Sequence, residues 1–337
     1  MTQSQSKTSE EAQERALNLL REGQRFVLSG HMRPDGDCLG AEAALAGVLR
    51  ALGKEVWIVN PDPIEHQFDY LARHNKYISW NGGALPSHDV SVLLDCSELS
   101  RCGRLGPAIE GMDSQKLVID HHIHMGEDWW DEAYVDVTAS ATGLLVFRIA
   151  KQLGVELDQS AAEGVFTSIV TDTGWFKYSN TDGETLRVAG ELVERGVDSS
   201  ALYSSIYQRH HRTHPLDTGI ILGTTEYHVG GRLAVICAPR DGDQAAASPD
   251  SDDALDILRS VGRVEVVLFL RELGSGMVKL SARSKTDYDV NALASEFGGG
   301  GHKKASGATI EGNLQDVSAR LVHSAESRFE ALVDGAR

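Results

Sequence analysis

Four short motifs place carboxylates and imidazoles directly after apolar runs. They read His-Met-Arg-Pro-Asp-Gly-Asp at 31–37, Val-Leu-Leu-Asp at 92–95, Ile-Asp-His-His at 119–122 and Val-Thr-Asp at 170–172. Side chains of these types bind divalent cations. The first three motifs follow strand-like runs, and the carboxyl ends of parallel strands meet at one edge of a sheet, so we expect these three to converge. The residues concerned are His31, Asp35, Asp37, Asp95, Asp120, His121, His122 and Asp172.

The charges of these motifs favour a site with two divalent cations. Two carboxylates about 4 Å apart repel each other by about 4 kcal/mol at an effective dielectric constant near 20. Two divalent ions would match the four negative charges of Asp35, Asp37, Asp95 and Asp172. Mixed imidazole and carboxylate ligands favour Mn²⁺, or its neighbours Fe²⁺ and Co²⁺, over Ca²⁺ and Mg²⁺. For any single acid the alternative is a helix cap, and Asp37 stands where it could cap the following helix.

The expected scaffold is a parallel sheet covered on both faces. Short apolar runs at 25–29, 56–59, 90–94 and 116–119 alternate with helical patterns at 10–22, 39–52, 141–153 and 160–170. Such alternation is typical of an α/β protein with a doubly wound sheet. Two further helices are predicted at 183–195 and 199–208.

A polar stretch at 208–215 is predicted to link two domains, a catalytic domain at 1–207 and a smaller α/β domain at 216–337, with a cleft between them. We expect His210, His211 and His214 in this stretch to be solvated rather than bound to metal. Beyond it the sequence predicts a helix at 216–227, a strand at 233–238, a solvated acidic loop at 241–253 and a hairpin of 264–271 with 278–284.

A second candidate site, for phosphate, lies near the C-terminus. Consecutive glycines at 298–301 let backbone N–H groups approach an anion closely. Arg283 offers a planar fork that matches phosphate, and Lys285, Lys303 and Lys304 add positive charge. The alternative is a flexible glycine turn with solvated lysines.

The composition excludes several classes of protein. The 337 residues carry 32 Lys and Arg against 49 Asp and Glu, a net charge of −17, which argues against binding long nucleic acid over a whole basic surface. Four cysteines without CxxC spacing favour reduced thiols over a disulfide framework. The sequence shows neither a secretory signal nor a long apolar run, so we expect a cytoplasmic protein without membrane contact.

The motifs together resemble those of the DHH phosphoesterase superfamily. HMRPDGD, LLD, IDHH and TDTG occur in the family's order, and SARSK with FGGGGHKKASGA resembles the companion DHHA1 domain. The combination is similar to the compact branch of nanoRNases and pAp phosphatases. The resemblance spans roughly residues 25–310.

The resemblance implies a role for each motif residue. His31 and Asp35 would hold one metal ion, and Asp37, His121 and Asp172 the other, with Asp95 bridging them. His122 would face the scissile phosphate, and Asp120 would orient it. The phosphate and nucleotide end of the substrate would be bound by Arg283, Ser284 and His302, with the backbone of Gly299, Gly300 and Gly301 close by.

The expected activity is hydrolysis of very short oligoribonucleotides and of 3′-phosphoadenosine 5′-phosphate (pAp), with Mn²⁺ as the preferred cofactor. A hydroxide shared by the two metals would attack phosphorus in line with the leaving oxygen. The alternatives are a phosphodiesterase for cyclic di-AMP or linear pApA, and a nucleotide sensor without catalysis. The resemblance also makes a homodimer plausible. Trp175, next to the last motif, is open to two interpretations, core packing or a stacking surface for a base.

Overall fold

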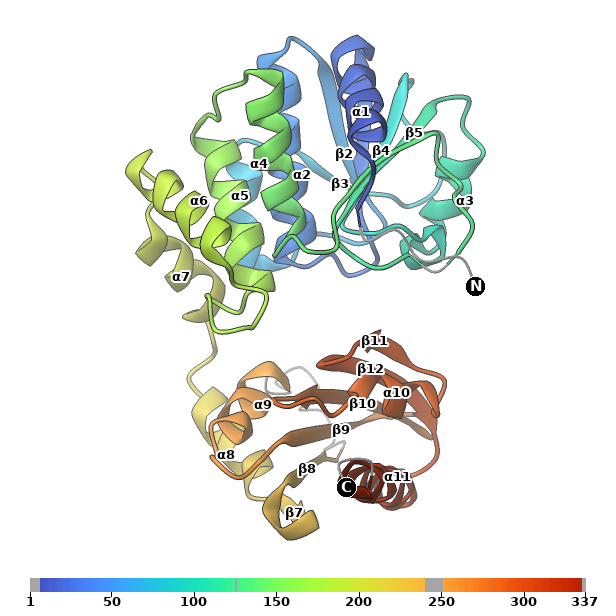
Figure 1. The fold of residues 1–337 in the computed structure, drawn as a ribbon, viewed down its shortest axis with the longest axis vertical. Coiled ribbons are helices and arrows are strands. Elements are labelled where there is room, and N and C mark those ends of the chain that lie inside the picture. Colours follow the sequence, from blue (N-terminus) through green and yellow to red (C-terminus); the bar gives the residue numbers. More distant parts are fainter. Residues whose placement is uncertain (1–6, 125, 240–250, 335–337) are drawn as a thin grey trace. The chain divides into compact units, whose positions relative to one another are not determined.

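The computed structural model describes residues 7–124, 126–239 and 251–334 (Figure 1). The chain divides into two compact units, Met1–Arg209 and His210–Arg337. None of the helices within the described ranges is both long and apolar enough to cross a membrane.

The first unit is built on a six-stranded sheet in which every strand pair is parallel. In spatial order the strands are β3 (Tyr77–Ser79), β2 (Glu55–Asn60), β1 (Arg25–Ser29), β4 (Val90–Leu94), β5 (Gln115–Asp120) and β6 (Glu132–Val135). The four central strands are those that the apolar runs predict. The two edge strands were not predicted, because runs of three and four residues carry too weak a pattern.

Helices cover both faces of this sheet, which confirms the doubly wound architecture (Figure 1). Alternate strand residues point to opposite faces, so Phe26 and Leu28 pack into one core and Val27 into another. The larger core contains α1 (Glu10–Glu22), α2 (Gly36–Ala51), α4 (Thr142–Leu153), α5 (Gln159–Asp172) and residues of α6 (Gly183–Glu194) and α7 (Ser199–Tyr207). The other face carries α3 (Leu105–Glu110), and two 3₁₀ helices, η1 (His66–Arg73) and η2 (Leu99–Cys102), complete the unit.

The strand order reverses between β1 and β4, which are neighbours in the sheet. From β1 the chain passes to β2 and β3 on one side, and then crosses back to β4, β5 and β6 on the other. The loops that leave β1 and β4 therefore diverge, and ligands of open α/β sheets bind in the crevice between such loops. The motif at 31–37 follows β1 and Asp95 follows β4, so both lie at this switch point.

Helices α2 and α5 cross in close contact through two glycines. A Cβ atom at Gly40 would lie 2.4 Å from the Gly164 carbonyl oxygen, and one at Gly164 would lie 2.6 Å from the Gly40 carbonyl oxygen. Only glycine permits this approach, because any side chain would collide with backbone atoms. The crossing brings the start of α2, with Asp37, beside the second half of α5, with Ser168.

We expect Gly164→Ala to lower the free energy of unfolding by about 1–3 kcal/mol, because the added methyl group forces the two helices apart. Urea denaturation measures this change. Gly190→Ala is the matched control, since a Cβ at this helical position meets nothing within 4 Å and alanine favours helix. Equal free energies of unfolding in the two variants would contradict this, because they would show that α2 and α5 accommodate the methyl group without loss of stability.

The second unit contains a mixed six-stranded sheet. Its spatial order is β11 (Gly300–His302), β12 (Ala305–Glu311), β10 (Met277–Ser284), β9 (Val266–Gly274), β8 (Leu233–Ala238) and β7 (Glu226–His228), with β8 and β9 parallel and the other pairs antiparallel. The predicted hairpin is confirmed as β9 and β10. Helices α10 (Val290–Ser295) and α11 (Leu314–Asp334) pack on one face, and α8 (His214–Leu222) and α9 (Ser251–Arg259) on the other.

Two predictions for this unit were wrong in part. The helix expected at 216–227 is α8, which begins at His214 and ends at Leu222, and the chain then forms the 3₁₀ turn η3 (Val229–Gly231) after β7. The acidic segment at 241–253 ends in α9, since residues 251–253 form its first turn; residues 241–250 lie outside the described ranges. Ala254, Leu255 and Leu258 bury one side of α9, and this apolar spacing outweighs the acidic start of the segment.

Candidate metal centre

Six of the predicted ligands meet at the switch point of the first unit. His31, Asp35 and Asp95 have ligand atoms within 4.8 Å of one another, and so do Asp37, His121 and Asp172. A third set of this kind contains Asp95, His121 and His122. The sets interlock, because Asp95 and His121 each belong to two of them.

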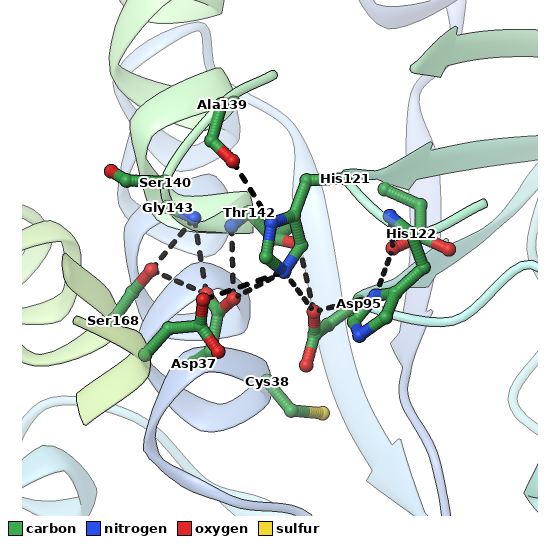
Figure 2. Close-up of polar contacts among 12 residues, drawn as sticks. Asp37, Cys38, Asp95, His121, His122, Ala139, Ser140, Thr142, Gly143 and Ser168 are labelled. Carbon is green, nitrogen blue, oxygen red and sulfur yellow. Dashed lines mark hydrogen bonds and ion pairs between the residues drawn. The ribbon is translucent and has the colours of Figure 1, made fainter. Parts of the chain in front are cut away.

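Asp95 lies between the two histidines that anchor these sets. Its Oδ2 is 3.5 Å from His31 Nε2. Its Oδ1 is 3.5 Å from His121 Nε2 (Figure 2). Beyond it, His31 Nε2 lies 3.8 Å from Asp35 Oδ2. On the other side, His121 Nε2 lies 3.3 Å from Asp37 Oδ2 and 3.9 Å from Asp172 Oδ2.

In the neutral form that binds a metal, both histidines would direct a nitrogen lone pair toward the carboxylates. His31 Nδ1 lies 2.9 Å from the Met32 carbonyl oxygen, and His121 Nδ1 lies 3.1 Å from the Ala139 carbonyl oxygen. A carbonyl oxygen only accepts, so Nδ1 carries the proton and the neutral ring is left with an acceptor at Nε2. Both Nε2 atoms are buried and have no hydrogen-bond partner among the described residues. Metal-binding histidines are commonly oriented in this way, so this donor set fits divalent cations.

Asp37 is placed by the start of helix α4. Its carboxylate accepts hydrogen bonds from the backbone N–H groups of Thr142 and Gly143, at 2.9 and 3.3 Å, and from the Ser168 hydroxyl (Figure 2). The positive end of the helix dipole favours a carboxylate at this position. The expectation that Asp37 could cap its own helix was wrong. Asp35 caps α2 instead, through one oxygen that accepts from the N–H groups of residues 37 and 38.

The backbone of Asp95 adopts an unusual conformation. Its φ angle is +57°, a left-handed value that few residues other than glycine adopt. Its N–H donates to the Ile119 carbonyl oxygen on β5, and its Oδ1 accepts from the Thr142 hydroxyl at 2.9 Å. Strained residues of this kind cluster at functional sites, where the surrounding structure enforces them.

His122 is held by Asp120 at the edge of the same site. Its Nδ1 lies 2.7 Å from Asp120 Oδ1, which also accepts from the backbone N–H of His122 at 3.0 Å. The other carboxylate oxygen accepts from the Ser97 hydroxyl. Asp120 is fully buried, whereas the side chain of His122 is 21% exposed. In this arrangement the buried Asp120 fixes the orientation of the His122 ring, and the partly exposed ring could contact a substrate.

Asp172 reaches the site from the end of a helix rather than from a strand. It is the last residue of α5, and its Oδ2 accepts from the Asn180 side-chain amide at 3.0 Å. Trp175 follows at a φ of +58° and packs edge-on against Phe166 and Tyr203, with ring centroids 6.0 and 4.9 Å apart. These contacts favour core packing for Trp175.

Sequence reasoning missed the residues that support the ligands. They are Ser97, Thr142, Gly143, Ser168 and Asn180, each of which donates a hydrogen bond to a ligand or to Asp120. The small polar run Ser-Ala-Thr-Gly at 140–143 was the available signal, because such residues are typical where a helix N-terminus receives an anion.

The charges of the site leave several groups holding protons that a cation would replace. Burial works against the charged form of His31, but Asp95 and Asp35 outweigh it and raise its pKa to about 9. Burial raises the pKa of Asp172 to about 6. Burial also raises the pKa of Asp37, and the charge of Asp95 adds to this effect. Asp95 itself stays ionised, since contacts with His121 and His31 overcome its burial and lower its pKa.

We therefore expect divalent cations to displace protons when they bind. Ligands must lose their protons to bind a metal, so the apparent affinity should rise with pH between about pH 6 and 9, the range set by Asp172 and His31. Isothermal titration calorimetry at pH 7 in buffers of different ionisation enthalpy should show at least one proton released. The exposed His323 is a control, since His323→Gln should release the same number. Heats that do not depend on the buffer would contradict this.

The predicted phosphate residues lie around one end of the second sheet. Arg283 of β10 pairs with Ala305 of β12, which pairs in turn with His302 of β11; the side chain of His302 lies outside the described part. Ser284 is buried, and its hydroxyl is 3.2 Å from both the carbonyl oxygen and the N–H of Thr286. Lys285 Nζ donates to the Val261 carbonyl oxygen.

The glycine run has a structural explanation of its own. A Cβ at Gly299 would lie 2.1 Å from the Gly307 carbonyl oxygen, and one at Gly301, where φ is +141°, would lie 2.6 Å from the Ala305 carbonyl oxygen. A Cβ at Gly300, by contrast, would have ordinary van der Waals space, since the nearest atom it would meet is Asn291 Oδ1 at 3.9 Å. The run therefore leads into strand β11 in close backbone contact with β12 and is not a flexible turn.

Comparison with known proteins identifies two domains in the chain. Residues 25–169 match the DHH family, N-terminal domain, and residues 243–331 match the DHHA1 domain. The "Bifunctional oligoribonuclease and PAP phosphatase NrnA" of Thermus thermophilus is 36% identical over 301 residues, which cover 89% of this chain and 88% of that protein. The protein of the same name from Bacillus subtilis is 25% identical over 85% of this chain and 89% of its own length.

A solved structure shares the fold. The crystal structure of an exopolyphosphatase-related protein from Bacteroides fragilis covers 97% of this chain and 98% of its own, with a TM-score of 0.86 at 24% identity. The family itself is shown by the two domain matches and by the 36% identical relative: the chain belongs to the DHH family, in the NrnA branch that carries a C-terminal DHHA1 domain.

Proposed function

We propose that this protein hydrolyses phosphoester bonds in very short oligoribonucleotides and in pAp, with two divalent cations bound at the metal centre. The observation that carries this proposal is the sharing of Asp95 between a set around His31 and a set around His121. A carboxylate shared in this way can bridge two adjacent cations and offset their mutual repulsion. The substrate class is supported by the two relatives named as bifunctional oligoribonuclease and PAP phosphatase.

Each metal would have its own ligands. His31 and Asp35 would hold one cation, and Asp37, His121 and Asp172 the other, with Asp95 common to both. We propose Mn²⁺ as the preferred ion because the set mixes imidazole and carboxylate ligands. Bound in this way, such a pair of cations activates water as a nucleophile and offsets the negative charge on the phosphoryl oxygens.

The chain's own residues would orient and protonate the substrate. Burial disfavours the charged form of His122, but Asp120 and Asp95 outweigh it and raise its pKa. With Nδ1 oriented by Asp120, the Nε2–H of a protonated His122 would donate toward a phosphoryl or leaving oxygen. Arg283, the backbone at Gly300 and His302 would recognise the phosphate and nucleotide end of the substrate in the second unit.

One comparative assay tests the proposal. The purified protein with Mn²⁺ is offered pAp, a labelled RNA series from dimer to pentamer, cyclic di-AMP and pyrophosphate. We expect turnover of the short RNAs and of pAp, and much slower turnover of the other two. Preferential cleavage of cyclic di-AMP would favour a cyclic dinucleotide phosphodiesterase. Binding without turnover of any compound would favour a nucleotide sensor.

A further inference from the structure

A second group of metal-type side chains lies in the C-terminal unit, apart from the candidate metal centre. It consists of His210, His214 and Asp253, whose ligand atoms all lie within 4.8 Å of one another. His214 is the first residue of α8, and Asp253 lies in the first turn of α9, 39 positions further along the chain. The DHH motifs do not include these residues.

The two imidazoles converge on a single carboxylate oxygen. His214 Nε2 lies 2.7 Å from Asp253 Oδ2, and His210 Nε2 lies 3.5 Å from the same oxygen. The two rings are stacked, with centroids 3.8 Å apart and planes only 10° from parallel. The Thr218 hydroxyl, one turn along α8, lies 3.5 Å from His214 Nε2.

This spacing suits a metal ion with tetrahedral geometry. Ligand atoms about 2.1 Å from a zinc ion lie about 3.4 Å apart in a tetrahedron. The separation of His210 Nε2 from Asp253 Oδ2 already has this value, and the shorter one to His214 needs to open by less than an ångström. The site is open on one side, since the side chains of His210 and Asp253 are 37% and 43% exposed, while that of His214 is 16% exposed. Water can therefore complete the coordination.

We propose that His210, His214 and Asp253 form a binding site for a late first-row divalent cation of the zinc class. Two imidazoles and one carboxylate bind Zn²⁺ more tightly than Mn²⁺, in line with the general order of metal affinities. The ion joins the segment before α8 to the start of α9, so its binding stabilises the folded C-terminal unit. The expectation that the histidines of 208–215 are all solvated then holds only for His211, which is exposed and contacts Thr213.

The test counts zinc on the full-length protein. Wild type, His214→Ala and His211→Ala are stripped with a chelator, incubated with Zn²⁺, desalted and analysed by mass spectrometry for zinc per chain. The candidate metal centre is unchanged in all three proteins and should bind the same amount of zinc in each. A difference in zinc content therefore reports on the site at His210, His214 and Asp253. We expect His214→Ala to carry one zinc ion fewer than wild type and His211→Ala to carry the same number. Unchanged hydrolysis of short RNA by His214→Ala with Mn²⁺ confirms that this variant is folded.

A milder variant addresses the alternative of a plain histidine–aspartate pair. Asp253→Asn keeps the shape and a hydrogen-bonding group but loses the charge, and we expect it to weaken zinc binding at this site at least tenfold. It should also lose most of the rise in melting temperature that Zn²⁺ gives the wild type. Equal zinc content and equal thermal shifts in wild type, His214→Ala and Asp253→Asn would overturn the proposal, as would an equal loss of zinc in His211→Ala.

Discussion

Replacement of Asp95 by asparagine is expected to reduce hydrolysis of short RNA and pAp by about 10³-fold, which corresponds to about 4 kcal/mol of lost transition-state stabilisation. Asp95 lies 3.5 Å from His31 on one side and 3.5 Å from His121 on the other, so its charge serves both ligand sets. Asparagine has the same shape and tolerates a positive φ better than most residues, so the backbone at +57° should persist.

The control for this variant is an aspartate at the opposite end of the same strand. Asp89 precedes β4 as Asp95 follows it, but it is paired with Arg25 at 2.7 Å and lies outside the metal centre. Asp89→Asn should keep its activity. Kinetics with Mn²⁺, a metal count per chain and a melting temperature separate loss of a ligand from loss of the fold. Full activity in Asp95→Asn would contradict the shared-carboxylate assignment.

Replacement of His122 by glutamine is expected to lower kcat by about 10²-fold or more while KM and metal content change little, because general acid catalysis by one side chain contributes about 10²–10⁴-fold. Although burial opposes the charged form, Asp120 and Asp95 raise the pKa of His122, which extends the protonated form of the imidazole to higher pH. In the wild type, activity should therefore fall on the alkaline side as His122 loses its proton. This alkaline limb should be absent in His122→Gln.

Ser97→Ala should reduce activity less than His122→Gln, because it disturbs His122 only indirectly. The Ser97 hydroxyl donates to the second oxygen of Asp120, so its removal loosens the group that orients His122 without touching His122 itself. We expect a loss of about tenfold, near the free energy of one hydrogen bond to a charged group. His122 also belongs to a possible ligand set with Asp95 and His121. Loss of a bound ion in His122→Gln would therefore assign it as a ligand instead.

Much of the metal centre follows from sequence pattern because its residues stand at the ends of parallel strands. His31 comes after β1 and Asp95 after β4, and these strands are neighbours at the point where the strand order reverses. Apolar runs and the residues that terminate them are local features, and the rules of parallel sheets convert them into proximity. A different local signal, two strand-like runs separated by a short glycine turn, predicted the antiparallel hairpin of β9 and β10.

Other contributions depend on packing between distant elements. Asp172 ends a helix, and it reaches His121 because α2 and α5 cross at Gly40 and Gly164, which no periodicity marks as partners. Asp37 is anchored by the start of α4, more than 100 positions away. The glycines at 299 and 301 prove to be sites of close backbone approach in the β11–β12 hairpin.

The sequence by itself determined the candidate ligands, their order along the chain and the parallel sheet, since these depend on residue type and local pattern. Only the tertiary structure decided how the ligands are supported, through Thr142, Ser168 and Asn180, and that His210 and His214 meet Asp253. The physical reason is that strand ends are brought together by backbone hydrogen bonding, which is regular. Helix crossings and side-chain contacts depend instead on the shapes of residues far apart in the chain.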